Sequence, residues 1–357
     1  MKINHNNYFN LAFNLAKLNL GKTKSNPSVG CVVVKDGSVI SSGYTSIGGR
    51  PHAEVNALNK NMNFRGSDLY VTMEPCTHHG LTPPCTNIIK KKKINNVYFS
   101  FYDIDKRTAR KSKSTLIKNK IKVYKKENNF NKDFYLSYVV NKVKELPLLD
   151  AKIAFSKDYF TISKKKGWIT NNFSRARTHL IRSEYDSVIS TSKSINKDNS
   201  LLNCRLEGFD PNKPNLIIID LKFVIKTNLD LFNLPRKRKI FIVTSNTNNK
   251  KKMLVLKKKL IKFINIKALK SKNDFIQLLK ILKKNGSCRI LVESGLIFLN
   301  KLLKEKLITN LYIFKSSTKL GKNGFNNCST NLIKKLKILK KVNVNLNGDQ
   351  LNKIKIR

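Results

Sequence analysis

Residues 51–85 set the architecture of the N-terminal half and read PHAEVNALNKNMNFRGSDLYVTMEPCTHHGLTPPC. Their pattern indicates a helix over residues 52–59 and a strand over residues 69–73. Two prolines then lead into a second helix, over residues 86–93. Helices and strands that alternate in this way are typical of a layered α/β domain.

The alternation continues on both sides of this stretch. Residues 7–20 have apolar side chains at helical spacing, and Gly21 is a suitable end for that helix. Two apolar runs flank Lys35-Asp36-Gly37, and the Asp-Gly pair predicts a hairpin of two strands. A further strand is expected over residues 97–101. We therefore predict one α/β domain over residues 1–145.

The pattern starts again near Pro147. The segments AKIAFS, VIS, LIIID, IFIVTS, ILVES and LYIFKS read as strands, and helical stretches such as DFIQLLKILKK separate them. A chain of 357 residues is too long for one typical hydrophobic core. We therefore predict a second α/β domain over residues 146–357.

The N-terminal stretch also carries the residues of a catalytic zinc site. His52, Cys76 and Cys85 supply one imidazole and two thiols, which leaves a fourth tetrahedral position for water. Zinc lowers the pKa of bound water enough to make hydroxide available near neutral pH. Glu54, two residues from His52, is expected to move protons between this water and a substrate. A His/Cys/Cys site with a non-ligand glutamate predicts a zinc-dependent deaminase.

Two other functions remain open on the residues alone. One is a tRNA or nucleoside deaminase with an appended basic domain, although such enzymes carry their two cysteines two residues apart and here THHGLTPP separates them. The other is a nucleic-acid-binding protein with a structural zinc, which would need four protein ligands and would have no use for Glu54.

Composition narrows the choice of partners. The formal charge of +49, from 71 Lys and Arg against 22 Asp and Glu, is spread over the chain and not gathered into one patch, so no nucleic-acid partner is expected. The N-terminus has no apolar signal region and the apolar runs are short, so neither export nor a membrane partner is expected. The six cysteines are read as thiols or metal ligands in a reducing compartment, the cytoplasm.

Three strings, NPSVGCVVVKDG (26–37), PHAEVNAL (51–58) and YVTMEPCTHHGLTPPC (70–85), resemble the deaminase half of the bifunctional riboflavin biosynthesis deaminase/reductase family. The resemblance implies a cytidine-deaminase-like three-layer α/β/α fold, with Asn26 holding the substrate. It also implies Zn²⁺ on His52, Cys76 and Cys85, with Glu54 as the acid-base. Where the family usually has a glycine, this chain has Arg110.

The C-terminal half resembles the reductase half of the same family, through AKIAFSKD, GWIT, RARTHLIR, INKDNSLLNCR, LIIID, LVESG and LYIFKSSTKLGKNG. This implies a dihydrofolate-reductase-like α/β domain that binds NADPH. The implied NADPH residues are Ala154, Trp168, Ser194, Asp198 and Gly295, and the implied substrate residues are Arg182, Leu202, Arg205 and Glu293. Arg182 and Arg205 suit a clamp on a substrate phosphate, because guanidinium groups offer forked donors.

The resemblance implies a bifunctional enzyme with a small phosphorylated aminopyrimidine as its partner. Hydrolytic deamination of 2,5-diamino-6-(5-phosphoribosylamino)pyrimidin-4-one would be followed by reduction of the ribosyl side chain to ribityl. A homodimer is also implied. The reductase half departs from the family at Tyr159 (usually Gly), Lys166 (usually Ser) and Asn199 (usually Asp).

Overall fold

The computed structural model describes residues 4–127, 131–165, 167–210, 213–233, 238–246, 248–336 and 341–356. The chain divides into two compact units, Met1–Leu146 and Pro147–Arg357. Both are α/β, which confirms the predicted class. Within the described ranges, no helix is both long enough and apolar enough to cross a membrane.

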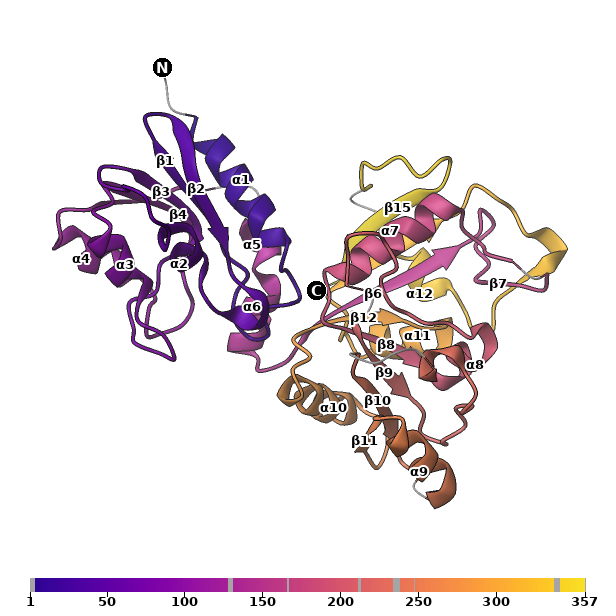
Figure 1. Cartoon of the computed structure of the whole chain (residues 1–357). Helices are drawn as coiled ribbons and strands as arrows, with labels where there is room; N and C mark the ends of the chain where they lie inside the picture. The colour runs from indigo at the N-terminus through magenta and orange to yellow at the C-terminus, as the bar shows by residue number, and fades with distance from the viewer. Residues whose placement is uncertain are drawn as a thin grey trace. The chain divides into compact units, whose positions relative to one another are not determined.

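The first unit is built on a five-stranded sheet in the order β2-β1-β3-β4-β5 (Figure 1). Strand β1 pairs antiparallel with both β2 and β3, whereas β3, β4 and β5 run parallel to one another. The strand bounds are β1 Gly30–Lys35, β2 Ser38–Tyr44, β3 Asp68–Met73, β4 Asn96–Phe101 and β5 Lys122–Lys125.

Helices cover both faces of this sheet, because its central strands β1, β3 and β4 have buried residues on both sides. On one face Phe9 and Ala12 of α1 pack with Val32, and on the other Ala53 of α2 and Ile89 of α3 join the cluster of the alternate strand residues. The helix bounds are α1 His5–Lys17, α2 Ala53–Leu58, α3 Cys85–Lys91, α4 Ser112–Ile117, α5 Asn131–Phe134 and α6 Leu136–Val143, with a 3₁₀ turn η1 at Ile47–Gly49.

The local predictions for this unit are confirmed, with small shifts at the ends of elements. Asp36 and Gly37 have φ of 50° and 75°, as the predicted hairpin turn requires. Helix α1 begins earlier than predicted because the Asn4 side chain accepts a hydrogen bond from the Asn6 amide, and it ends at Lys17. Gly30 permits the close approach of α1 to β1, since a Cβ there would lie 1.8 Å from the Ala12 carbonyl oxygen.

The second unit is built on an eight-stranded sheet in the order β11-β10-β9-β8-β12-β6-β13-β15. Only the β13–β15 pair is antiparallel. The bounds are β6 Leu148–Phe155, β8 Ser187–Thr191, β9 Asn215–Ile219, β10 Ile240–Thr244, β11 Lys262–Asn265, β12 Arg289–Glu293, β13 Asn310–Lys315 and β15 Gln350–Lys355. A small pair, β7 Ile162–Ser163 and β14 Gly324–Phe325, lies outside this sheet.

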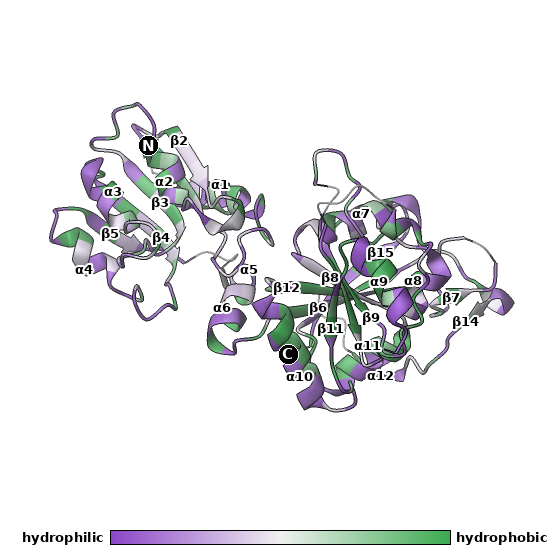
Figure 2. Cartoon of the chain, turned by 60° about the horizontal axis from the view of Figure 1, so that its bottom comes forward, coloured by the Kyte–Doolittle hydropathy of each residue, from purple (hydrophilic) through white to green (hydrophobic). Residues whose placement is uncertain are grey.

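The central parallel strands are mainly apolar, as Figure 2 shows by their green colour. Both Ile217 and Ile218 of β9 are fully buried although they point to opposite faces, because helices cover both sides of the sheet. The helix bounds are α7 Asn172–Ser183, α8 Ser192–Asp198, α9 Lys250–Lys258, α10 Lys272–Lys284, α11 Leu296–Lys304 and α12 Asn331–Lys334, with 3₁₀ turns η2 Asp230–Phe232 and η3 Gly321–Asn323.

All six strands that the sequence predicts here are present, together with helix α10. The two strands at the sheet edges, β11 and β15, were not predicted. Their sequences, KFIN and QLNKIK, carry lysine and asparagine, because an edge strand is half solvated. Such strands lack the continuous apolar run that marks their central neighbours.

Candidate functional site

Three metal-binding side chains meet in the first unit. The Nδ1 of His52 lies 3.3 Å from the Cys85 sulfur and 3.7 Å from the Cys76 sulfur. All three ligand atoms lie within 4.8 Å of one another. A tetrahedral zinc with bonds of about 2.0–2.3 Å needs ligand atoms about 3.5 Å apart, so the separations fit this ion. Among the described residues this cluster has three protein ligands, as a catalytic site does and a closed structural site does not.

The chain positions these ligands from the ends of short elements. His52 directly precedes α2, Cys76 follows β3, and Cys85 is the first residue of α3. The backbone N–H of Cys85 donates to the Cys76 sulfur at 3.2 Å, which ties the two thiols together. Hydrogen bonds from Cys85 and His52 lower the pKa of Cys76 to about 4. The pKa of the Cys85 thiol is raised, mainly by its side-chain hydrogen bond with Cys76 and next by its burial.

Glu54 lies in the pocket beside these ligands. Its side chain is buried, only 4% exposed, and it lines the same pocket as His52 and Cys76. Burial, and then the negative charge of Cys76, raises the pKa of Glu54 to about 7. A carboxyl group with such a pKa can both accept and donate a proton near neutrality.

Asn26 lines the same pocket from the loop after α1. Its side-chain amide donates to the Gly49 carbonyl at 3.1 Å. Gly49 has φ of 93°, and a Cβ there would lie 2.4 Å from the Asn26 nitrogen, so the glycine is what allows this approach. The sequence resemblance identified Asn26 but gave no reason for the glycine.

A second loop, residues 103–112, is held against the pocket by Glu74. The Glu74 carboxylate accepts from the backbone N–H groups of Asp103 (3.3 Å), Arg110 (3.0 Å) and Ser112 (3.1 Å), and from the Ser112 hydroxyl (2.8 Å). Four donors satisfy this buried carboxylate, so its role in the structure is to shape the loop.

Arg110, which stands where the resembled family usually has glycine, keeps a glycine-like backbone. Its φ is 61°, in the left-handed region. The hydrogen bond from its amide to Glu74 helps to hold this conformation, and its guanidinium lies 5.1 Å from the centre of the Tyr102 ring. The side chain at this position therefore strains the loop backbone.

The remaining wall of the pocket was not predicted. Tyr138 and Lys142, one turn apart on α6, contact the loop: the Tyr138 hydroxyl donates to Asp103 at 2.7 Å and the Lys142 ammonium pairs with Asp105 at 3.1 Å. Arg107 also pairs with Asp105, at 2.6 Å. The spacing of four residues on α6 was a weak signal in the sequence, but only the folded chain shows which loop it meets.

In the second unit a buried ion pair joins α7 to β12. The Arg182 Nε and Nη2 donate to the two Glu293 oxygens at 2.5 and 3.0 Å, and both side chains are about one-tenth exposed. Lys152 of β6 lies 3.9 Å from the same carboxylate. Burial opposes ionisation of Glu293, but Arg182 and Lys152 outweigh it and lower the pKa of this carboxyl.

The loop over residues 201–205 adjoins this pair. Arg182 Nη1 donates to the Asn203 carbonyl at 3.0 Å, and the His179 ring lies 2.9 Å from the same oxygen. Leu202 is buried, with φ of 52°, whereas Arg205 is exposed. The two arginines of the predicted phosphate clamp are therefore not equivalent. Arg182 is already paired with Glu293. Arg205 is exposed, and its guanidinium donates to the Asn203 side chain at 2.8 Å.

The predicted cofactor residues are only partly gathered. A Cβ built on Gly295, the residue before α11, would lie 3.8 Å from the Ser194 hydroxyl of α8, so these two are neighbours. Asp198 is exposed at the end of α8, and Ala154 is half-buried on β6. Trp168 is 70% exposed and stacks against the guanidinium of Arg175 at 5.1 Å, so it is not a packed core aromatic.

Two of the three departures in this unit lie among the described residues. Tyr159 has φ of 66° and Asn199 has φ of 43°. Tyr159, like Arg110, thus keeps a left-handed backbone at a position where the family usually has glycine. Lys166 lies outside the described residues.

Comparison with known proteins finds a relative for each half. Residues 2–101 match the cytidine and deoxycytidylate deaminase zinc-binding region, which contains His52, Cys76 and Cys85. Residues 149–350, more than half of the chain, match the RibD C-terminal domain.

Relatives of full length combine both halves. The riboflavin biosynthesis protein RibD of Aquifex aeolicus is 31% identical over 88% of this chain and 87% of its own length. The RibD of Buchnera aphidicola is 29% identical over 88% of this chain and 87% of its own. The solved structure of Acinetobacter baumannii RibD superimposes with a TM-score of 0.81 at 25% identity and covers 98% of each chain.

Proposed function

The chain belongs to the RibD family of bifunctional riboflavin biosynthesis deaminase/reductases, and from this premise we propose its substrates, its reductant and the roles of its residues. Its N-terminal half is a zinc deaminase of the cytidine-deaminase-like fold, and its C-terminal half is a reductase of the dihydrofolate-reductase-like fold. We assign the first activity to residues 1–145 and the second to residues 146–357.

The deaminase substrate is 2,5-diamino-6-(5-phosphoribosylamino)pyrimidin-4-one. His52, Cys76 and Cys85 hold Zn²⁺, which supplies a hydroxide nucleophile when bound. Asn26 orients the pyrimidine from the pocket wall. Glu54 takes a proton from the attacking water and passes it to a ring nitrogen, then takes the hydroxyl proton of the tetrahedral adduct and passes it to the amino group, which departs as ammonia. The observation that carries this proposal is the meeting of three ligand atoms within 4.8 Å in a pocket that Glu54 also lines.

The reductase substrate is the deaminated product, and the reductant is NADPH. NADPH, when bound, would supply a hydride to the ribosyl carbon that bears the amine, and with a proton on the ring oxygen the sugar would open to a ribityl chain. Ala154, Trp168, Ser194, Asp198 and Gly295 line NADPH. Leu202, Arg205 and the Arg182–Glu293 pair line the substrate, and the exposed Arg205 guanidinium supports a contact with its phosphate. The active protein is a homodimer.

A coupled assay tests both halves in one sample. Ammonia release and NADPH oxidation are followed separately with the diaminopyrimidine substrate, and zinc is counted in the purified protein. We expect about one zinc per chain and equal amounts of ammonia and oxidised NADPH. Ammonia without NADPH oxidation would confine the activity to the first half and refute the reductant.

The Glu54→Gln variant tests the role of that carboxylate. It should keep its zinc yet release ammonia at least about a hundredfold more slowly, because the amide cannot accept the proton. NADPH oxidation with the deaminated substrate should persist. If the variant loses both its zinc and its ammonia release, Glu54 is a ligand and not the proton carrier.

A further inference from the structure

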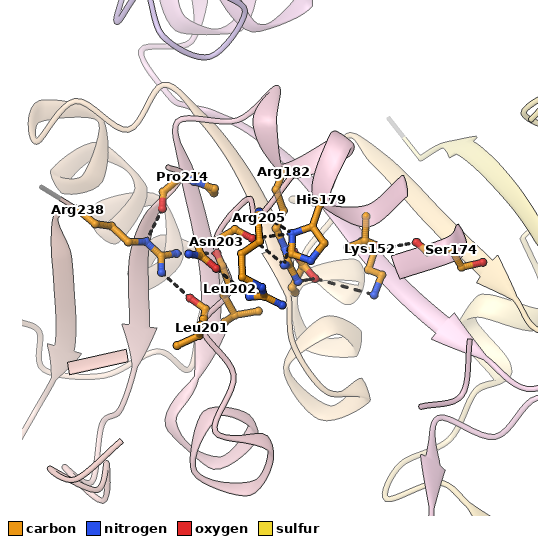
Figure 3. Close-up of polar contacts among 12 residues, drawn as sticks. Lys152, Ser174, His179, Arg182, Leu201, Leu202, Asn203, Arg205, Pro214 and Arg238 are labelled. Carbon is orange, nitrogen blue, oxygen red and sulfur yellow. Dashed lines mark hydrogen bonds and ion pairs between the residues drawn. The ribbon is translucent and has the colours of Figure 1, made fainter. Parts of the chain in front are cut away.

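Arg238 holds a loop of the reductase half through three backbone carbonyls. Its side chain comes from the segment just before β10, and its guanidinium donates to the Pro214 oxygen at 2.6 Å, to the Leu202 oxygen at 2.6 Å and to the Leu201 oxygen (Figure 3). These carbonyls belong to irregular backbone, which has no ladder of its own to satisfy them. A planar guanidinium can serve three such acceptors at once, because its five N–H groups point in fixed directions.

The loop that Arg238 holds is strained. Leu202 is buried and has φ of 52°, a backbone conformation that is unfavourable for a residue with a Cβ. Such a conformation persists only when its surroundings fix it. Two of the three Arg238 acceptors are the carbonyls of Leu201 and Leu202 themselves.

The opposite side of the loop is fixed by α7. His179 and Arg182 both contact the Asn203 carbonyl, and the Arg205 backbone N–H lies 3.2 Å from the His179 ring nitrogen. Arg182 in turn is paired with Glu293. Figure 3 shows the loop lying between Arg238 on one side and the His179–Arg182 pair on the other. Leu202 and Arg205 are therefore held from two directions.

The surroundings of the loop disfavour the charged form of Arg238. Burial lowers the pKa of Arg238, and the positive charges of Arg182 and Arg205 lower it further. Arg205 likewise has its pKa lowered by burial and by Arg182. The negative charge of Glu293 raises the pKa of Arg238, but Glu293 is already paired with Arg182. The surplus positive charge around the loop suits an anionic ligand.

We propose that Arg238 is a positioning residue of the reductase, which fixes the backbone at Leu202 so that Leu202 and Arg205 present one arrangement to the phosphoribosyl part of the substrate. The inference rests on the proposed function of these two residues. The Nε, Nη1 and Nη2 groups of Arg238 each donate to a backbone carbonyl, so Arg238 acts through the loop and does not itself bind the phosphate.

Steady-state kinetics of Arg238→Met in the full-length protein test the proposal, with the deaminated pyrimidine and NADPH as substrates. We expect the KM for the pyrimidine to rise about tenfold or more, while kcat and the KM for NADPH change less than about threefold, since lost substrate binding appears in KM. Lys239→Met is the matched control, because it removes an equal charge from the next, exposed side chain. It should leave all three constants unchanged.

Arg238→Lys separates charge from geometry. An ammonium keeps the charge but cannot reproduce the fork, so this variant should have a pyrimidine KM between those of the parent and Arg238→Met. If Arg238→Met does not fold, Arg238→Lys decides alone. Parental KM in either folded variant, even with a lowered melting temperature, would overturn the proposal. A parent protein that never oxidises NADPH would instead refute the proposed function.

Discussion

The two halves of the chain gather charge of opposite sign. The first unit brings two thiols and a buried carboxyl group around the imidazole of His52, a set of donors that calls for a cation. The second brings Lys152, Arg182, Arg205 and Arg238 around the single carboxylate of Glu293, a set that calls for an anion. Each set of side chains thus suits a ligand of the opposite charge, and each should fail differently when one of its members is removed.

Cys85→Ser should break the first set most completely. Loss of one thiolate removes a metal ligand, so zinc should fall well below one per chain and ammonia release should fall about a thousandfold or more. NADPH oxidation with the deaminated pyrimidine should persist. Cys328→Ser, a change of the same kind at a thiol outside the metal cluster, is the control. Full zinc content in Cys85→Ser would remove this residue from the ligand set.

Glu293→Gln should break the second set. Removing the acid leaves the buried Arg182 guanidinium and the nearby Lys152 without their partner, which should cost the second unit about 3–5 kcal/mol of unfolding free energy. Chemical denaturation followed by circular dichroism measures this. Glu207→Gln, the same change at an exposed acid in the same unit, is the matched control and should cost much less. Equal losses of unfolding free energy in the two variants would mean that the buried ion pair contributes no more to stability than an exposed acid does.

His179 provides a pH test of the same cluster. Burial, and then the charges of Arg182 and Arg205, lowers its pKa from 6.5 to about 4, so between these values the unfolded chain takes up a proton that the folded chain does not. Stability should therefore fall as the pH drops from 7 toward 4, by about 1–2 kcal/mol after solvent screening.

The His179→Gln variant should lose this part of the pH dependence. Asp186, whose pKa burial raises to about 7, contributes with the opposite sign, so the quantity to measure is the difference between variant and parent. Melting temperatures at several pH values provide it. Parallel curves for the two proteins would contradict the prediction.

Arg110→Gly should sharpen the comparison from the side of the first unit. Glycine adopts a φ of 61° without strain, and the substitution should stabilise the unit by about 0.5–1 kcal/mol despite the lost contact with Tyr102. Ammonia release should be unchanged, because Arg110 is not among the residues that line the pocket of the zinc cluster. Lys106→Gly, an exposed position in the same loop, should not stabilise; a loss of stability in Arg110→Gly would show that the cation–aromatic contact outweighs the strain.

The metal cluster could be predicted from sequence because its chemistry is local. His52, Cys76 and Cys85 are rare residue types, and one imidazole with two thiolates is a known ligand set of catalytic zinc. The Asp36-Gly37 hairpin was predictable for the same reason, since its backbone conformation narrows the choice of residues.

The cationic set could not be derived in this way. Lysine and arginine are abundant throughout the chain, so Arg182 and Arg238 carry no signal of their own. The sequence suggested two arginines free to grip a phosphate, but only the folded chain shows that Glu293 engages one of them. The pairing of Lys142 with Asp105 was hidden for a similar reason, because it depends on where α6 meets a loop.

The strand order has a consequence for folding during synthesis on the ribosome. Both partners of β1, β2 and β3, follow it closely in the sequence. Strand β6 instead pairs with β12 and β13, so Leu148 can pair only after Arg289 has been synthesised. Contacts so distant in sequence form slowly and leave strand edges open in the meantime. We expect the first unit to fold while the second is still being synthesised, and the nascent reductase to be the part that needs a chaperone.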